Sequence, residues 1–587
     1  MKFTRTTLAA TAVIATLALG GTTAAIIGVA GAQGQTDTDP VTAEPEGPAV
    51  MPAAPMMPEA ETAPSMPMVE PVEMPIEEMD PPWPGRFGPL TEREQALAEA
   101  AWSYFETNYH PETGLINAVQ NFPSASMWDL ASYLGGLVAA YELGIINKTT
   151  FDRRAHAFIA TMRTLQLTRD GVPNKVYNTR TGERTDYTNT AGEIGFSGID
   201  IGRMLIWLAI LKDRYPYLAT GIDRAVMRWN FCELVDGGEL HGSSVQNGDV
   251  VYRQEGRLGY EQYAAKGFGL WGFEMDASTT PTPYQTVDLF GVDVPFDGRD
   301  PRTFHAQNYV VTEGYVLDGI ELNWDLPIDE TSSHFVHTDG WRAEFAQRIY
   351  LAQQRRFEHM GILTARSEHQ IAGSPYFVYD SLFSNGYAWN TLTPRQEYVP
   401  DLAAVAAKAA VAMWALWDTE FTDLLFDAVA ELTPEEGNGV YEGLFENGDG
   451  PIEIRTANNN GIILASLLYK VQGPILARRS NYAQAWFTLD QDNEIRRRRC
   501  QPLAPIEAAC ADCQMGCETG HALPTLSEYQ YCQPASNAEW YPGCTTCLTS
   551  TAVTACQVEP LVTPIPAAAG SQCRLPQQSA ALPVDAR

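Results

Sequence analysis

The sequence predicts an all-α domain of about twelve helices with a few β-hairpin insertions, flanked by two segments of different composition. The chain has 587 residues, with 45% hydrophobic and 10% aromatic content, enough for one large core. Apolar residues recur at helical spacing between about residues 90 and 470. A single large helical toroid is compatible with this length and helix count.

Residues 1–32 are typical of a secretory signal peptide. Two basic residues near the start precede an apolar run from Leu8 to Val29, and a triplet of small residues ends at Ala32. We expect cleavage after Ala32 and export to the periplasm, the cell surface or the extracellular space. If the apolar run stayed uncleaved, it would tether the protein to a membrane.

Residues 33–84 are rich in proline, methionine, glutamate and alanine. Repeated proline and few β-branched residues favour an extended chain without a packed core. We therefore expect a disordered linker and assign no catalytic role to it.

The toroid domain is predicted at residues 85–485, beginning with a helix whose N-cap is Thr91. Leu97, Ala101 and Phe105 fall on one face of that helix, and Glu92 lies in its first turn. Segments 169–190 and 234–256 are polar and contain glycine, which favours hairpins or long loops. Further helices are expected at about 126–144, 149–166, 197–214, 216–230, 258–272, 307–324, 334–357, 376–385, 401–417, 419–432 and 458–470.

The C-terminal segment, residues 500–587, contains nine of the ten cysteines. In an exported chain this pattern predicts a disulfide-stabilised tail, because so few large apolar residues cannot form a core alone. Two Cys-x-x-Cys pairs, beginning at Cys510 and Cys544, would also suit a zinc site. Because nine is odd, one cysteine is free, joins another chain or pairs with Cys232.

The formal net charge of −33 argues against a phosphate-backbone partner, since nucleic-acid binding depends on clustered lysine and arginine. The acidic surface mainly favours solubility. The histidines show no convincing metal-ligand spacing, and no glycine-rich phosphate loop is present. We therefore expect no nucleic-acid partner, no metal and no cofactor.

Several segments share one pattern, in which a loop with glycine or serine is followed by a carboxylate and an aromatic residue and then by an apolar helix. In residues 256–271, Glu261 lies between Tyr260 and Tyr263. If the inner helices of a toroid begin at one end, such carboxylates would line one cavity. A first-turn acid can equally serve as a helix cap or dipole partner. The other candidate carboxylates are Asp129, Asp200, Glu313 and Glu368.

This combination suits hydrolysis of a glycoside. The reaction needs one protonated carboxyl to assist the leaving oxygen and one ionised carboxylate to activate water or attack carbon. Aromatic faces can pack on sugar rings, and amides can bind hydroxyls. Asp200 and Arg203 could equally form a structural ion pair, and the asparagines at 458–460 could cap a helix. The candidate substrate-binding residues are Trp128, Arg203, Tyr260, Gln262, Tyr315, Tyr376, Trp389, Glu446, Asn458 and Asn460.

Seven segments together resemble a secreted bacterial domain-of-unknown-function family related to the glycoamylase-like proteins. The resemblance covers roughly residues 88–475 and implies an alpha/alpha six-fold toroid of twelve helices with a carbohydrate-sized cleft. In such relatives a glutamate beside a tyrosine at the start of a central helix resembles a general acid, and Glu261 matches it best. This chain departs from the pattern at Gly314, where proline is expected, and at Ala465 and Ser466, where an acid is expected. The segments are 126–130, 195–203, 259–265, 312–321, 374–380 with 386–389, 441–447 and 456–469.

We therefore predict a glycoside hydrolase that acts on a bacterial cell-surface or extracellular polysaccharide resembling a β-glucan. Glu261 is the predicted acid, and Asp129 or Asp200 the preferred base, with Glu313 and Glu368 as further candidates. Inversion is expected, which requires carboxyls about 6.5–9.5 Å apart. The alternatives are a non-catalytic glycan-binding module and a structural envelope protein linked through the odd cysteine.

Overall fold

The computed structural model describes residues 11–14, 27–30, 85–281, 283–300, 308–324, 340–476 and 493–502. Strands β1 (Thr11–Ile14) and β2 (Ile27–Ala30) pair antiparallel within the expected signal segment. The expected linker at 33–84 and nearly all of the cysteine-rich tail lie outside the described residues. Among the described residues, no helix is both long and apolar enough to cross a membrane.

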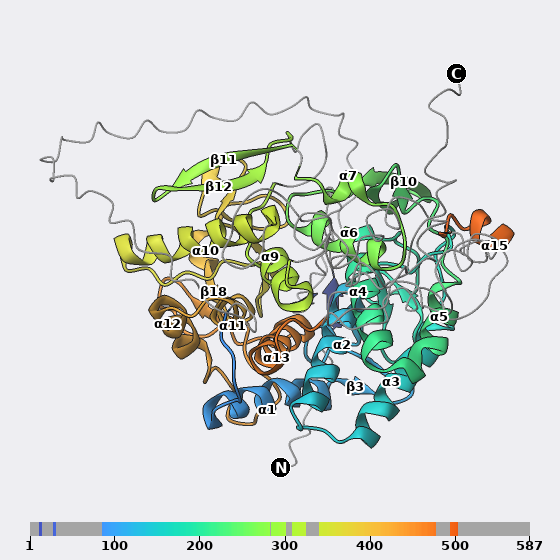
Figure 1. The fold of residues 1–587 in the computed structure, drawn as a ribbon, viewed down its shortest axis with the longest axis horizontal. Helices are drawn as coiled ribbons and strands as arrows, with labels where there is room; N and C mark the ends of the chain where they lie inside the picture. The colour runs from blue at the N-terminus through green and yellow to red at the C-terminus, as the bar shows by residue number, and fades with distance from the viewer. Residues whose placement is uncertain are drawn as a thin grey trace, which may run out of the picture.

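Six helices in the described part of the chain form a closed inner ring (Figure 1). Each packs against the next, and the last packs against the first, so the helical toroid expected from the sequence is confirmed at this level. The ring consists, in order, of α2 (Met127–Glu142), α4 (Gly198–Arg214), α6 (Tyr260–Leu270), α9 (Glu313–Leu317) with its π-helical continuation η2 (Asp318–Leu322), α11 (Ala407–Leu416) and α13 (Ala457–Gln472).

Other helices pack around this ring. Helix α1 contacts α13 and α2, α3 contacts α2, α5 contacts α4, α10 contacts α9, and α12 contacts α11. Thr91 caps α1 as expected, in a capping box with Glu94. These helices are α1 (Glu92–Thr107), α3 (Lys148–Met162), α5 (Ala219–Val226), α10 (Trp341–Met360) and α12 (Glu420–Val429). The short helices are α7 (Asp276–Thr279), α15 (Asn493–Arg498), η1 (Pro216–Leu218) and η4 (Pro400–Leu402).

Small antiparallel sheets connect the helices, and the hairpins expected within 169–190 and 234–256 are confirmed. The pairs and triplets are β3 (Tyr109–His110) with β4 (Leu115–Ile116), β5 (Ser124–Ser126) with β6 (Val176–Asn178) and β7 (Arg184–Thr185), β8 (Val235–Asp236) with β9 (Glu239–Gln246) and β10 (Asp249–Gln254), β11 (Tyr284–Leu289) with β12 (Val292–Asp297), β13 (His369–Gln370) with β14 (Phe377–Asp380) and β17 (Thr391–Leu392), β15 (Phe383–Ser384) with β16 (Tyr387–Ala388), and β18 (Ala404–Ala406) with β19 (Gly443–Phe445).

The helix expected at 376–385 is wrong, because this segment forms strands β14 and β15. The aromatic and β-branched residues of β14 suit a pleated surface, and β14 pairs with β13 on one side and β17 on the other. The helices expected at 307–324 and 401–417 begin later than expected, at Glu313 and Ala407. Residues 404–406 form β18 and lead directly into α11.

Inner helices α4 and α6 pack with their backbones in contact. A Cβ atom at Gly202 would lie 2.5 Å from the carbonyl oxygen of Ala264, and one at Gly267 would overlap the carbonyl oxygen of Gly202. Only a residue without a side chain allows two helices to approach this closely. The glycines therefore set the separation of α4 and α6.

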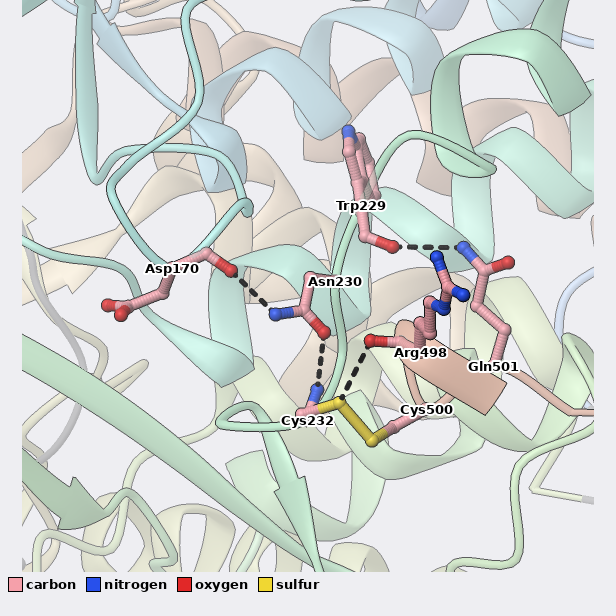
Figure 2. Close-up of a disulfide and its surroundings, with 7 residues drawn as sticks. All are labelled: Asp170, Trp229, Asn230, Cys232, Arg498, Cys500 and Gln501. Atoms are coloured by element: carbon pink, nitrogen blue, oxygen red, sulfur yellow. Dashed lines mark hydrogen bonds between the residues drawn. A yellow bond between two sulfur atoms is a disulfide. The ribbon is translucent and has the colours of Figure 1, made fainter. Parts of the chain in front are cut away.

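A disulfide between Cys232 and Cys500 attaches residues 493–502 to the helical domain (Figure 2). Next to it, Gln501 Nε2 donates to the carbonyl oxygen of Trp229 at 2.9 Å, and Asn230 Nδ2 donates to the carbonyl oxygen of Asp170 at 3.0 Å. Of the alternatives for the odd cysteine, pairing with Cys232 is confirmed.

Candidate functional site

A cleft of about 590 Å³, partly open to solvent, lies where the inner helices begin. Each of the six inner helices contributes a residue of its first turn, which confirms that all six begin at the same end of the ring. The described residues that line the cleft are Ala118, Ser126, Trp128, Asp129, Asp200, Tyr260, Glu313, Glu368, His369, Gln370, Phe377, Lys408, Glu442, Thr456 and Asn458.

Asp129 takes part in a capping box at the start of α2. Its Oδ2 accepts hydrogen bonds from the backbone N and Oγ of Ser126, at 3.0 and 2.8 Å. Among the described residues nothing donates to Oδ1, and the side chain is partly exposed to the cleft. Burial raises the pKa of Asp129, although the Ser126 hydrogen bonds and the charge of Arg203 oppose this shift.

Asp200 occupies the equivalent position in α4, but it is more deeply buried, with only 3% of its surface exposed. Ser197 Oγ donates to Oδ1 at 3.1 Å, whereas Oδ2 has no hydrogen-bond partner among the described residues. Burial raises the pKa of Asp200 well above its usual range, and the nearby carboxylates of Glu255 and Asp129 raise it further. The environment therefore favours the protonated acid.

Glu313, the first residue of α9, lies in the opposite environment. Its Oε1 accepts hydrogen bonds from Trp128 Nε1 at 2.9 Å and Asn458 Nδ2 at 2.8 Å. Its Oε2 forms an ion pair with Lys408 and accepts a longer hydrogen bond, 3.3 Å, from Ser367. Burial alone would raise the pKa of Glu313, but the charges of Lys408 and Arg203 outweigh it and lower the pKa. Glu313 is therefore held as a carboxylate.

Two further carboxyls of the cleft are engaged by protein groups. Glu368 forms an ion pair with Arg257 at 2.9 Å and accepts a hydrogen bond from the Tyr260 hydroxyl at 3.4 Å. Glu442 accepts hydrogen bonds from Thr456 Oγ1 and from the backbone N of Gln370. Burial raises the pKa of both carboxyls. Protein donors therefore engage the oxygens of both carboxyls.

Aromatic side chains form one wall of the cleft. The ring of Trp128 lies 5.4 Å from that of Tyr260 and 6.0 Å from that of Tyr263, both edge-on. Phe377 of β14 also lines the cleft. Flat apolar faces beside carboxyl groups are the combination that binds a pyranose ring.

Of the carboxylates and binding residues expected from the sequence, the structure brings seven to the described cleft wall. They are Trp128, Asp129, Asp200, Tyr260, Glu313, Glu368 and Asn458.

Glu261 is absent from the described residues that line the cleft. Its Oε1 accepts hydrogen bonds from Gln254 Nε2 at 2.6 Å and Ser278 Oγ at 3.0 Å, between α6, α7 and the end of β10. Successive residues of a helix point about 100° apart, so when Tyr260 faces the cleft its neighbour faces away. Glu261 therefore does not lie in the described cleft wall, where the expected general acid has to be.

The remaining expected residues support the cleft from outside it. Arg203 lies beneath it and donates to Asn458 Oδ1 at 2.9 Å. Gln262 accepts from the backbone N of Gly259 at 2.7 Å and closes the start of α6. Tyr315 is buried beneath the guanidinium of Arg342.

Glu446 bridges Arg356 and Arg366 through both carboxylate oxygens. Trp389 packs on Arg356, 4.4 Å from the guanidinium carbon to the ring centre. Asn460 accepts from the backbone N of Val440 at 2.8 Å, and Thr456 caps α13 in place of the asparagines weighed for that role. Tyr376 lies in the turn between β13 and β14, in the left-handed backbone region with φ 67°.

Sequence reasoning missed Lys408 and His369 as parts of the cleft, whereas Glu442 lies in segment 441–447, which shares the pattern of carboxylate and aromatic residues. Lys408 had a signal, because it is the single charged residue of the apolar segment 403–416. A buried charge of this kind needs a partner, here Glu313. His369 follows no comparable pattern. No group of three or more histidine, cysteine, aspartate or glutamate side chains among the described residues could hold a metal ion.

A family model described as "Protein of unknown function (DUF3131)" matches residues 96–473. No curated protein matches the chain. Among solved structures, an endo-β-1,2-glucanase from Chitinophaga pinensis is 11% identical with a TM-score of 0.48, covering 68% of this chain and 97% of its own. An endo-β-1,2-glucanase from Talaromyces funiculosus is 12% identical with a TM-score of 0.44, covering 65% of this chain and 84% of its own. Because these TM-scores lie below 0.5, we infer function from the site residues.

Proposed function

Because the chain belongs to the DUF3131 family, whose function is unknown, we propose an activity from the cleft itself: hydrolysis of a glycosidic bond by acid–base catalysis. The range of the family match agrees with residues 88–475, over which the sequence resembles glycoamylase-like relatives. The observation that carries the proposal is that Asp200 and Glu313 line one cleft in opposite environments. Carboxyls whose surroundings drive their pKa values apart are typical of an acid and base pair.

Asp200 acts as the general acid. Its protonated carboxyl donates a proton to the leaving glycosidic oxygen, and Oδ2 is the oxygen without a protein partner among the described residues. Glu313 acts as the general base. It takes the proton from the attacking water as that water adds to the anomeric carbon, while Trp128 and Asn458 donate to its Oε1 and Lys408 and Ser367 contact its Oε2. The bond between the anomeric carbon and the glycosidic oxygen breaks, that oxygen leaves as an alcohol with the proton from Asp200, and the water oxygen becomes the hydroxyl of a new hemiacetal.

The substrate is a polysaccharide of the β-glucan type at the bacterial cell surface or outside the cell. Trp128, Tyr260 and Phe377 supply apolar faces for sugar rings, and Asp129 Oδ1 is an acceptor for a hydroxyl group. The signal-like residues 1–32 support export. Inversion is part of the proposal, since both oxygens of Glu313 already contact protein groups, which disfavours direct attack on the anomeric carbon.

The first prediction tests the pair. The full mature chain would be incubated with neutral β-glucans of β-1,2, β-1,3, β-1,4 and β-1,6 linkage, and reducing-end release measured. Asp200→Asn and Glu313→Gln should each lower release at least about 100-fold, because each removes a proton-transfer group. Glu261→Gln, which alters a similar buried glutamate outside the cleft, should stay within about threefold of the wild type.

Thermal melts of all three variants serve as folding controls, and NMR of the first product gives its anomeric configuration. Loss of activity in Glu261→Gln with retention in Asp200→Asn would return the acid role to Glu261. A wild type that binds one of these glucans and releases no reducing ends would establish the glycan-binding module instead.

A further inference from the structure

Arg203 lies directly below the cleft, one turn along α4 from Asp200. Only 1% of its surface is exposed, and it is not among the described residues that line the cleft. It was expected to contact substrate, but its guanidinium is covered by protein. Arg203 instead contacts two side chains, each of which donates a hydrogen bond to Glu313.

The first contact is with Asn458 of α13. Arg203 Nη1 donates to Asn458 Oδ1 at 2.9 Å, and Ser132 Oγ donates to the same oxygen at 2.8 Å. An amide has one oxygen that accepts and one nitrogen that donates. With the oxygen fixed by two donors, the nitrogen must face Glu313, to which it donates at 2.8 Å.

The second contact is with Trp128 of α2. The guanidinium carbon of Arg203 lies 4.4 Å from the centre of the indole ring. A cation at this distance is attracted to the ring face and restrains its tilt. The same indole donates its Nε1 hydrogen to Glu313 Oε1 at 2.9 Å. Both donors on Oε1 therefore depend on Arg203.

Below Arg203, the buried Glu321 of η2 fixes the guanidinium in place. Arg203 Nη2 lies 3.6 Å from Glu321 Oε1, which also accepts from Trp207 Nε1 at 3.0 Å. Tyr263 donates its hydroxyl hydrogen to Glu321 Oε2. Arg203 is thus held between a rigid floor and the cleft wall.

We propose that Arg203 is a positioning residue that orients Asn458 and Trp128 and so fixes the plane of the Glu313 carboxylate. This inference rests on the proposed function in one respect, namely that Glu313 is the base. Arg203 acts through the shape of its guanidinium group as well as its charge. One terminal nitrogen contacts Asn458 and the other contacts Glu321, in two different directions.

The test compares Arg203→Lys and Arg203→Met with Lys212→Met in the full mature chain. Lys212 lies on the same helix and forms an equally buried ion pair with Asp223, away from the cleft. Both Arg203 variants should lower kcat roughly 10- to 100-fold with KM within about threefold, because the base is misplaced and the sugar-binding wall remains. Lys212→Met should lower the melting temperature and leave kcat within about twofold.

The pH profile separates charge from geometry. Arg203 is faced by Glu321, Tyr263 and Glu313, and its charge lowers the pKa of Glu313 and Asp129. Arg203→Met should therefore shift the acidic limb of kcat/KM to higher pH, whereas Arg203→Lys should lower kcat with that limb in place. A merely structural role would move neither limb.

The proposal would be overturned if Arg203→Met had the same kcat as the wild type. It would also be overturned if Arg203→Met and Lys212→Met lowered kcat equally. A crystal structure of Arg203→Met supplies a readout without activity. The contact between Asn458 Nδ2 and Glu313 Oε1 should be lost, and its retention would also overturn the inference. Absence of hydrolysis in the wild type would refute the proposed function and leave the crystal structure to decide the role of Arg203.

Discussion

Glu261 is a buried carboxyl whose protonation affects the stability of the protein. Burial raises its pKa from 4.5 to about 7, although Arg299 and the hydrogen bond from Ser278 oppose the shift. The folded protein therefore holds this proton more tightly than the unfolded chain. The contribution is fully present below pH 4.5 and is lost as the pH rises through about 7.

Glu261→Gln should remove this dependence. Between pH 4.5 and 8 the wild type should lose on the order of 3 kcal/mol more unfolding free energy than the variant, since each pKa unit corresponds to about 1.36 kcal/mol. Urea unfolding at several pH values measures the difference, and Glu321, which titrates in the same range, is common to both proteins. If the unfolding free energies of the two proteins changed in parallel with pH, the raised pKa of Glu261 would be contradicted.

At the scale of single residues, the sequence predicted seven of the described residues that line the cleft. Acids such as Asp129, Asp200 and Glu313 were predictable, because they lie in the first turns of apolar helices that meet at one end. The side on which a residue points was not predictable, since Tyr260 and Glu261 differ by one position and helix boundaries carry larger errors. Arg203 was also expected at the surface of the site, and its contacts with Glu321 are too distant in sequence to foresee.

The close packing of helices α4 and α6 can be tested with two glycine substitutions in α6. Gly267→Ala should lower the unfolding free energy by roughly 1–3 kcal/mol, because the new Cβ would overlap the backbone of Gly202. Gly269→Ala, two residues along α6, is the matched control, since no described atom lies within 4 Å of its added Cβ.

The unfolding free energy of Gly269→Ala should rise by up to about 1 kcal/mol, because alanine has a better helix propensity than glycine. Thermal and urea unfolding of the two variants give the comparison. A stable Gly267→Ala protein would show that α4 and α6 are not in backbone contact.

Helices were predictable where periodicity and a cap agreed, as at Thr91, which caps α1. Segment 376–385 was not, because its apolar residues satisfy either a helix or a strand. Pairing of β14 with β13 and β17 decided between them, and both pairings depend on residues outside the segment. Short strands such as β18 shortened helix α11 for the same reason.

For the whole molecule, the Cys232–Cys500 disulfide changes the cysteine count of the tail. Of the ten cysteines two are paired, which leaves eight, all beyond the described residues. An even number can pair within the tail, so the odd cysteine that would link the chain to an envelope partner is already used.

The oxidised protein should therefore contain no titratable thiol after denaturation. Cys232→Ser should expose one, and Cys232→Ser with Cys500→Ser should again expose none while losing about 2–4 kcal/mol of stability. Thiol titration and non-reducing mass spectrometry measure the thiol content, and urea unfolding measures the loss of stability. A thiol in the wild type, or a disulfide-linked dimer, would contradict pairing within the tail.

The inner ring closes where α13 packs against α2, the last helix of the ring against the first. A chain emerging from the ribosome therefore carries the inward face of α2 without its neighbour until residues 457–472 have been synthesised. Products that terminate earlier keep an apolar groove along α2, and such unpaired surfaces are prone to aggregate. Expression fragments of this protein should accordingly extend beyond residue 472, and nonsense mutations even near the end of the ring should behave as complete losses.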